Sequence, residues 1–158
     1  MTFTIKPAGI ADAETVALLV GELLNEIMDA MGRKEFAFNQ ADACQRAENF
    51  LRRKVCFAFI ARSLTGNDAL GLIVVYASHA LYAEGDFGTI SEFYVRPTFR
   101  SQGIGQALLE SARHFGRAEA WKRIEVTTPP LPLFQRTLEF YEKQGFAVTG
   151  GLKLKSLL

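Results

Sequence analysis

One stretch of 18 residues, 88–105, constrains the fold of this chain more than any other part of the sequence. It reads Gly-Thr-Ile-Ser-Glu-Phe-Tyr-Val-Arg-Pro-Thr-Phe-Arg-Ser-Gln-Gly-Ile-Gly. Residues 88–95 have the composition of a β-strand, and Pro97 ends it because proline cannot donate to a strand ladder. Past Gly103, apolar residues recur at the spacing of one helix face as far as Gly116, which we expect to stop the helix. The stretch therefore predicts a strand, a short turn and an amphipathic helix in direct succession.

The turn between this strand and this helix has the chemistry of an anion site. The first N–H groups of a helix have no intrahelical partner and carry partial positive charge. Gly103 and Gly105 let a phosphate approach those groups closely, and Arg100 adds a formal charge. The spacing fits neither a dinucleotide-binding fingerprint nor a P-loop lysine motif. The alternative is that the glycines only let the helix pack closely on the sheet.

The rest of the chain predicts an α/β fold around this stretch. Asp12 and Asn39 are expected to cap two helices, and Gly32 is expected to end the first. A further helix is expected over 133–144, and strands are expected over residues 2–5, 55–61, 69–80, 88–95, 123–127, 146–148 and 152–157. The order is strand-helix-helix-strand-strand-strand-helix-strand-helix-strand-strand. Because it mixes hairpins with helical crossovers, it predicts a mixed seven-stranded sheet with helices on both faces.

Length and charge narrow the function. A chain of 158 residues fits one domain, 1–158, and a net charge of +1 offers no general field for nucleic acid or an anionic membrane. The start lacks the pattern of a signal peptide and no apolar run has the length of a membrane span, so we expect a cytoplasmic protein. Cys44 and Cys56 are interpreted as reduced thiols in a helix and a buried strand. His79 and His114 have no ligand partners at metal-binding spacing, so no metal is predicted.

Two segments carry a family resemblance. Phe-Tyr-Val-Arg-Pro at 93–97, followed by Arg-Ser-Gln-Gly-Ile-Gly at 100–105, resembles the acyl-CoA-binding motif of the GNAT superfamily of N-acyltransferases. The family form of that motif is Arg or Gln, two residues, Gly, one residue, then Gly or Ala. Leu-Glu-Phe-Tyr-Glu-Lys-Gln-Gly-Phe at 138–146 is similar to the family's second motif, and the predicted element order matches the family fold from end to end. The resemblance implies an acetyl-CoA-dependent N-acetyltransferase acting on a primary amine of a small molecule or peptide.

The resemblance also implies how the cofactor is held. The diphosphate of coenzyme A would lie against residues of the turn and the helix start: Arg100, Ser101, Gln102, Gly103, Ile104, Gly105 and Gln106. The segment Phe93, Tyr94 and Val95 would contact the pantetheine arm, with the main chain of Phe93 and Val95 binding it like an added strand. That arm would enter where the strands ending near Val95 and Thr127 separate. The family often has Asn seven residues before the motif tyrosine, where this chain has Phe134.

Two residues are candidates for proton transfer. Moving an acetyl group onto an amine requires a base for the amine proton and an acid for the departing thiolate. Tyr141 stands where the family places the tyrosine that protonates the thiolate, although it fits a packing role as well. Glu92 is the ionisable residue inside an otherwise apolar or neutral strand, and relatives often have an acidic residue there that acts as a base through water. An ion pair or a solvent-exposed edge position is the other interpretation of Glu92, and Ser91 is a weaker substitute as base.

Other functions stay open at this stage. The chain is alternatively a GNAT-fold protein that binds acyl-CoA as a regulator without turnover, or an interaction protein whose glycine turn is structural. An enzyme that acetylates charged tRNA is a third possibility, against which the near-neutral charge counts. Glu84 and Asp86, in the loop before the central strand, are read as solvated charges rather than as an attraction for a cationic amine. The acceptor is not encoded in any recognisable motif, and the oligomeric state is open, with a homodimer common among relatives.

Overall fold

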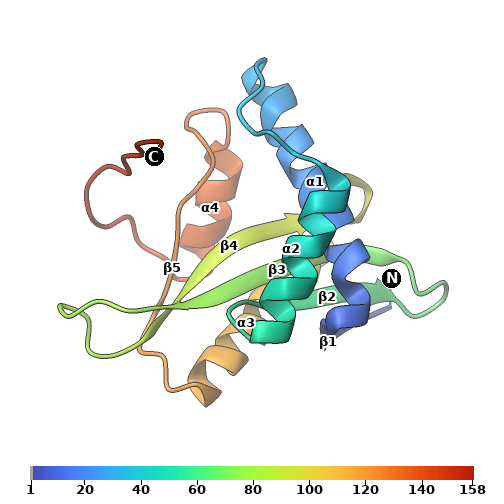
Figure 1. Cartoon of the computed structure of the whole chain (residues 1–158), viewed down its shortest axis with the longest axis horizontal. Coiled ribbons are helices and arrows are strands. Elements are labelled where there is room, and N and C mark those ends of the chain that lie inside the picture. Colours follow the sequence, from blue (N-terminus) through green and yellow to red (C-terminus); the bar gives the residue numbers. More distant parts are fainter. Residues whose placement is uncertain (1) are drawn as a thin grey trace. The chain divides into compact units, whose positions relative to one another are not determined.

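The computed structural model describes residues 2–158, and the chain divides into two compact units, with the boundary in the sequence between Thr127 and Thr128. The single domain over 1–158 stays a prediction. The first unit contains β1 (Phe3–Pro7), the 3-10 turn η1 (Ile10–Asp12), α1 (Ala13–Met31), α2 (Gln40–Arg53), β2 (Phe57–Ser63), β3 (Ala69–Ser78), β4 (Phe87–Val95), the 3-10 turn η2 (Pro97–Phe99), α3 (Ile104–Ala118) and β5 (Ile124–Val126) (Figure 1). The second unit contains α4 (Gln135–Lys143).

The sheet of the first unit is mixed, as predicted. Its five strands lie in chain order, β1-β2-β3-β4-β5. The first four pair antiparallel with their neighbours, while β5 pairs parallel with β4 after the crossover through α3. The prediction of a mixed α/β sheet is therefore confirmed.

Helices cover both faces of this sheet, which confirms the second expectation about the fold. Alternate residues of β2 show it. Ala58 and Ile60 belong to the core cluster that includes Val16 and Leu19 of α1, with α2 at its margin. Phe59, which lies between them in the strand, points the other way and meets the ring of Phe115 in α3 at 5.8 Å between centroids. In strands successive side chains point to opposite faces, so α1 and α2 lie on one face and α3 on the other (Figure 1).

The prediction of seven strands is wrong, because residues 146–158 form no strand. The alternation of Leu and Lys over 152–155 is typical of a strand. Alternation alone does not make a strand, however, since the main chain must also find a pairing partner. Leu152 and Leu154 are instead exposed, and Gly145 and Gly150, both in the left-handed conformation, bound the segment between them.

Two of the three predicted helix caps, Asn39 and Gly32, are present, whereas Asp12 has a different role. Asn39 caps α2 through its Oδ1, which accepts from the Asp42 N–H at 3.0 Å, and Gly32 ends α1 with a left-handed φ of 68°. Asp12 does precede α1, but its side chain accepts no hydrogen bond from that helix. Its Oδ2 accepts from the Gly9 N–H at 2.8 Å, and its Oδ1 accepts from Arg62 at 3.1 Å. The carboxylate therefore closes the turn η1 and ties it to β2.

Gly116 does not stop the third helix, which runs on to Ala118. The glycine makes room for a ring instead. A Cβ at Gly116 would lie 2.8 Å from Cε3 of Trp121, and a Cβ at Gly88 in β4 would also collide with that indole. Trp121 thus fits between helix and strand only because both positions lack a side chain.

The two cysteines are free thiols and both are partly buried. Cys44 lies in α2, as predicted. Cys56 precedes the first residue of β2, so its expected place inside a buried strand is wrong by one residue. Burial raises the pKa of the Cys56 thiol, and the nearby charge of Glu92 raises it further.

Candidate functional site

The pairing between the two parallel strands β4 and β5 ends well before β4 itself ends. β4 and β5 pair at three positions, and the last pair is Ile90 with Val126. β4 continues to Val95, so the pairing with β5 ends five residues before the strand does. On its other edge β4 stays paired with β3 as far as Val95 opposite Gly71. Residues 92–95 of β4 therefore pair with β3 on one edge and do not pair with β5 on the other.

The main chain of Phe93 and Val95 faces this second edge. The Arg96 N–H donates to the Leu70 carbonyl in β3 at 2.9 Å. Main-chain groups of alternate residues in a strand point to opposite edges, so those of residues 93 and 95 point away from β3. The Val95 carbonyl accepts a hydrogen bond from Nε of Arg100 at 2.8 Å on that side. The orientation is the one that strand addition by an extended ligand requires.

The turn after β4 leads to the start of α3. Gly103 is the N-cap residue with a φ of 82°, and Ser101 also has a left-handed φ, of 60°. The N–H of Ala107 makes the first intrahelical bond, to the Gly103 carbonyl at 3.0 Å. The N–H groups of residues 104–106 precede that bond and have no intrahelical partner. They form a positively polarised helix start of the kind that binds phosphate.

Side chains around this helix start divide into one buried anchor and several exposed groups. Ile104 is buried and fixes α3 on the sheet, whereas Ser101, Gln102 and Gln106 are exposed. Gln102 donates from Nε2 to the Thr98 carbonyl at 3.3 Å. The helix start therefore has a buried footing and a polar, accessible outer side, which suits an anionic ligand.

Arg100 does not extend toward the helix start. Its Nη2 donates to both carboxylate oxygens of Glu26 in α1, at 2.8 and 2.9 Å, and its Nε donates to Val95. Its guanidinium also lies 5.7 Å from the centroid of the Tyr94 ring. That ring is buried beneath α1, and burial raises the pKa of its hydroxyl. Sequence reasoning missed Glu26, although Glu22 and Glu26 repeat the four-residue spacing of Arg96 and Arg100.

Glu92 lies on the sheet face covered by α1 and α2. Its Cα partner in β3 is Val74, which belongs to the core cluster under α1. Directly paired residues of antiparallel strands project to the same face. Cys56 packs against the same cluster. Burial raises the pKa of the Glu92 carboxyl, and a hydrogen bond donated by the Ser91 hydroxyl partly offsets this. A carboxyl with a raised pKa is better matched to accepting a proton near neutral pH than an ordinary one.

Tyr141 belongs to the second unit, and its side chain is buried. It lies in α4, its ring centroid is 5.2 Å from that of Phe146, and its carbonyl accepts from the Phe146 N–H at 3.0 Å. Burial raises the pKa of its hydroxyl. The phenol therefore stays protonated at physiological pH, as a proton donor must. Phe134 stands at the N-cap of α4, where its carbonyl accepts from the Leu138 N–H at 3.3 Å.

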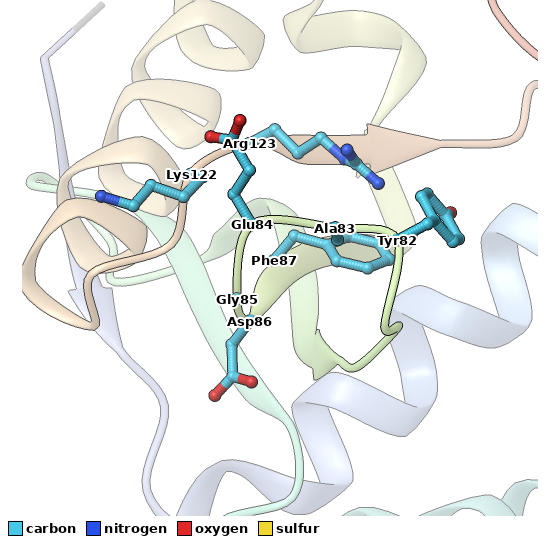
Figure 2. Close-up of a pocket in the computed structure, with 8 residues that line it drawn as sticks. All are labelled: Tyr82, Ala83, Glu84, Gly85, Asp86, Phe87, Lys122 and Arg123. Carbon is cyan, nitrogen blue, oxygen red and sulfur yellow. The ribbon is translucent and has the colours of Figure 1, made fainter.

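A pocket lies at the opposite end of β4, between the loop before that strand and the start of β5 (Figure 2). Arg123 lies over the rings of Phe87 and Tyr82, 4.6 and 5.4 Å from their centroids. Glu84 and Asp86 also line this pocket, and Asp86 is hydrogen-bonded to Nδ1 of His79 at 2.8 Å. From Phe87 to Val95 the strand extends roughly 25 Å at its usual rise, so this pocket is distant from the helix start.

Residues 2–158 contain no group of three or more His, Cys, Asp or Glu side chains that could hold a metal ion. Among these residues no helix combines the length and the apolar character needed to cross a membrane.

Comparison with known proteins identifies the family. The family model described as Acetyltransferase (GNAT) domain matches residues 55–148, which include the end of β4, the start of α3 and α4. The chain belongs to the GNAT acetyltransferases. The resemblance inferred from the two motifs is thereby confirmed.

Individual GNAT relatives differ in what their names say they acetylate. An "IAA acetyltransferase" of Azospirillum brasilense is 33% identical over 81 residues, and the match spans 51% of each chain. The present chain thus spans about half the length of this curated relative. A ribosomal-protein-alanine N-acetyltransferase of Brucella melitensis biovar Abortus 2308 has the same fold, with a TM-score of 0.73 and 20% identity over 99% of both chains. A predicted acetyltransferase of Clostridium acetobutylicum, solved with acetyl-CoA, has a TM-score of 0.78 and 18% identity over 98% of this GNAT chain and 96% of its own.

Proposed function

We propose that this protein transfers the acetyl group of acetyl-CoA directly to a primary amine of a small molecule or peptide. The observation that carries the proposal is the end of β4, where pairing with β5 stops at Ile90 and the strand leads through a short turn to the start of α3. An extended thioester arm fits the edge, and a diphosphate fits the helix start. The solved relative with acetyl-CoA has the same fold and supports this choice of acyl donor.

Each part of acetyl-CoA has an expected partner in this proposal. The main-chain groups of Phe93 and Val95 bind the amides of the pantetheine arm, with Tyr94 between them. The main-chain amides of residues 100–106 bind the diphosphate, and the left-handed Ser101 and Gly103 shape their turn. Acetyl-CoA supplies the acetyl thioester when bound, and the residues of the chain hold it in reach of the acceptor.

The proposed chemistry requires two proton transfers. The acceptor nitrogen forms a bond to the acetyl carbon as the C–S bond breaks, which produces an amide and coenzyme A. Glu92, through water, accepts the proton that the amine loses, and its raised pKa suits that task. Tyr141 donates the proton that the sulfur gains, and its raised pKa keeps the donor loaded. The names of two relatives mention IAA and a ribosomal-protein alanine, which are different acceptors, so the acceptor of this protein has to be identified by assay.

The test combines binding with turnover. Calorimetry should give a Kd for coenzyme A, and acetyl-CoA with a panel of polyamines, amino acids and peptides should release free thiol with one class of amine. Glu92→Gln and Tyr141→Phe should each lower kcat by roughly 100-fold or more, as loss of a general base or acid does. Glu110→Gln on the outer side of α3 and Tyr82→Phe in the exposed loop are the matched controls. Tight coenzyme A binding without thiol release from any amine would favour a regulator instead, and absence of binding would exclude the acyl donor.

A further inference from the structure

We infer that Glu26 is a positioning residue for the cofactor site, because it holds Arg100 on the Val95 carbonyl and so ties the end of β4 and the following turn to α1. This inference rests on the proposed function. The cofactor site has two halves, the strand edge that receives the pantetheine arm and the helix start that receives the diphosphate. The inference concerns how these two halves are held in position relative to each other.

The contacts of Arg100 are directed away from the helix start. Three hydrogen bonds occupy two of its three nitrogens, with Nη2 on both Glu26 oxygens and Nε on the Val95 carbonyl. The contacts of Nη2 with Glu26 and of Nε with Val95 together fix the direction and the plane of the guanidinium. While Glu26 holds it, Arg100 bridges α1 to the last residue of β4.

A second ion pair reinforces the first, one helical turn earlier on α1. Arg96 donates from Nε and Nη2 to the two oxygens of Glu22, at 2.9 and 2.7 Å, and from Nη1 to the Ala69 carbonyl at 2.8 Å. Hydrogen bonding to Glu22 raises the pKa of Arg96. Glu22 and Glu26 lie four residues apart and therefore share one face of the helix. The segment 96–100, which joins the strand edge to the turn, is thus held to α1 at both ends.

This arrangement predicts a result opposite to that of the simplest alternative. In the alternative, Arg100 is a direct phosphate ligand, and Glu26 competes with the cofactor for it. Removing the charge of Glu26 would then free Arg100 and tighten binding. If Glu26 positions the site, the same change releases the end of β4 from α1 and weakens binding of any ligand that bridges both halves. The carbonyl of Val95 has two lone pairs, so Arg100 and an arm amide can share it.

The experiment measures Kd by calorimetry for coenzyme A and for ADP, which carries a diphosphate without the pantetheine arm. Glu26→Gln should raise the Kd of coenzyme A about threefold to tenfold, the size expected for one bidentate pair that is partly exposed. The Kd of ADP should stay unchanged, because the helix-start amides are intact. In turnover the variant should raise the KM for acetyl-CoA with little change in kcat.

Two further variants make the outcome decisive. Glu14→Gln, in the first turn of the same helix, controls for the loss of one negative charge. Arg100→Gln should weaken coenzyme A binding to the same extent as Glu26→Gln, and the double variant should be no weaker than either, since each substitution breaks the same link from α1 through Arg100 to Val95. Tighter or unchanged coenzyme A binding by Glu26→Gln, additive losses in the double variant, or a parallel loss of ADP would each overturn the inference. Failure of the wild-type protein to bind coenzyme A would instead overturn the proposed function, and the inference with it.

Discussion

Gly71, in the central strand β3, should not tolerate the smallest side chain. Its Cα lies opposite Val95 in β4. A Cβ built on it would lie 2.5 Å from the Tyr94 carbonyl oxygen and 3.0 Å from the Val95 Cα. Both are main-chain atoms of a strand paired along this edge, so neither can rotate out of the way as a side chain would.

The cost of Gly71→Ala follows from these distances. An ordinary carbon to carbonyl-oxygen contact is about 3.3 Å or longer. The peptide between residues 94 and 95 must therefore move by roughly 0.8 Å. Overpacking of this kind costs about 1–3 kcal/mol, and replacing a strand glycine by alanine returns about 0.5–1 kcal/mol. We expect a net loss of up to about 2.5 kcal/mol in the free energy of unfolding, with a central value of about 1 kcal/mol, which corresponds to roughly 2–4 °C in Tm.

The displaced atoms also belong to the proposed cofactor edge, so the same substitution should weaken coenzyme A binding. Thermal and urea unfolding measure the first effect, and calorimetry with coenzyme A measures the second. Gly151→Ala is the matched control, because no atom lies within 4 Å of a Cβ built there. A Gly71→Ala protein as stable as Gly151→Ala would refute the packing argument. A destabilised variant with unchanged coenzyme A affinity would refute the link between Gly71 and the cofactor edge.

Three further substitutions test separate parts of the structure. Gly103→Ala meets no atom but forces alanine to a φ of 82°, so it should cost about 1–2 kcal/mol and weaken coenzyme A binding in calorimetry, with Gly32→Ala, which is similarly strained but lies outside the cofactor turn, as control. Because burial raises the Glu92 pKa in the folded state, ionisation destabilises the fold as pH rises through that pKa; Glu92→Gln should raise Tm at pH 8 but not at pH 4, and an equal gain at both would contradict this. Gly116→Ala should lower Tm and change Trp121 fluorescence, since its Cβ would meet the indole; an unchanged emission spectrum would count against that contact.

The start of α3 was predictable because several independent signals coincide there. A proline ends the strand, glycines open the helix, and the apolar spacing continues for three turns. The second helix was predictable for a similar reason, since Asn39 supplies a cap before an amphipathic run. Local chemistry decides such boundaries, and local chemistry is what a sequence displays most directly.

Features that depend on distant partners were not predictable in the same way. The expected strands after residue 145 had the right alternation, but nothing in that pattern says whether a neighbouring strand is available. Gly116 was interpreted as a helix stop, although it accommodates an indole five residues later. The partner of Arg100 is Glu26, 74 residues earlier, and only the fold brings α1 alongside the turn. The motif identified Arg100 but could not show the direction of its side chain.

The face of the sheet on which Glu92 lies was not predictable either, because one extra residue in β4 interrupts the regular alternation of side chains. Ile90 pairs with Val75, and Val75 pairs with Phe57, whose ring meets Phe115 of α3 at 4.4 Å between centroids. Strict alternation would put Glu92 on that same face, beneath α3. The register shifts instead, because β3 passes from Val75 to Val74 while β4 passes from Ile90 to Glu92, which leaves Ser91 as the extra residue of a β-bulge.

The bulge turns Glu92 to the face of α1 and α2, and the pairing with β5 ends at the residue before it. One inserted residue thus coincides with the end of the parallel ladder and presents the candidate base on the face opposite α3. Deleting Ser91 should remove the bulge and leave Glu92 opposite Val74, on the face of α1 and α2, because Glu92 would then follow Ile90 directly. Full activity in the deletion variant would show that the reaction needs Glu92 on this face but not the bulge itself, whereas loss of acetyl transfer with coenzyme A binding retained would show that the bulge is needed as well.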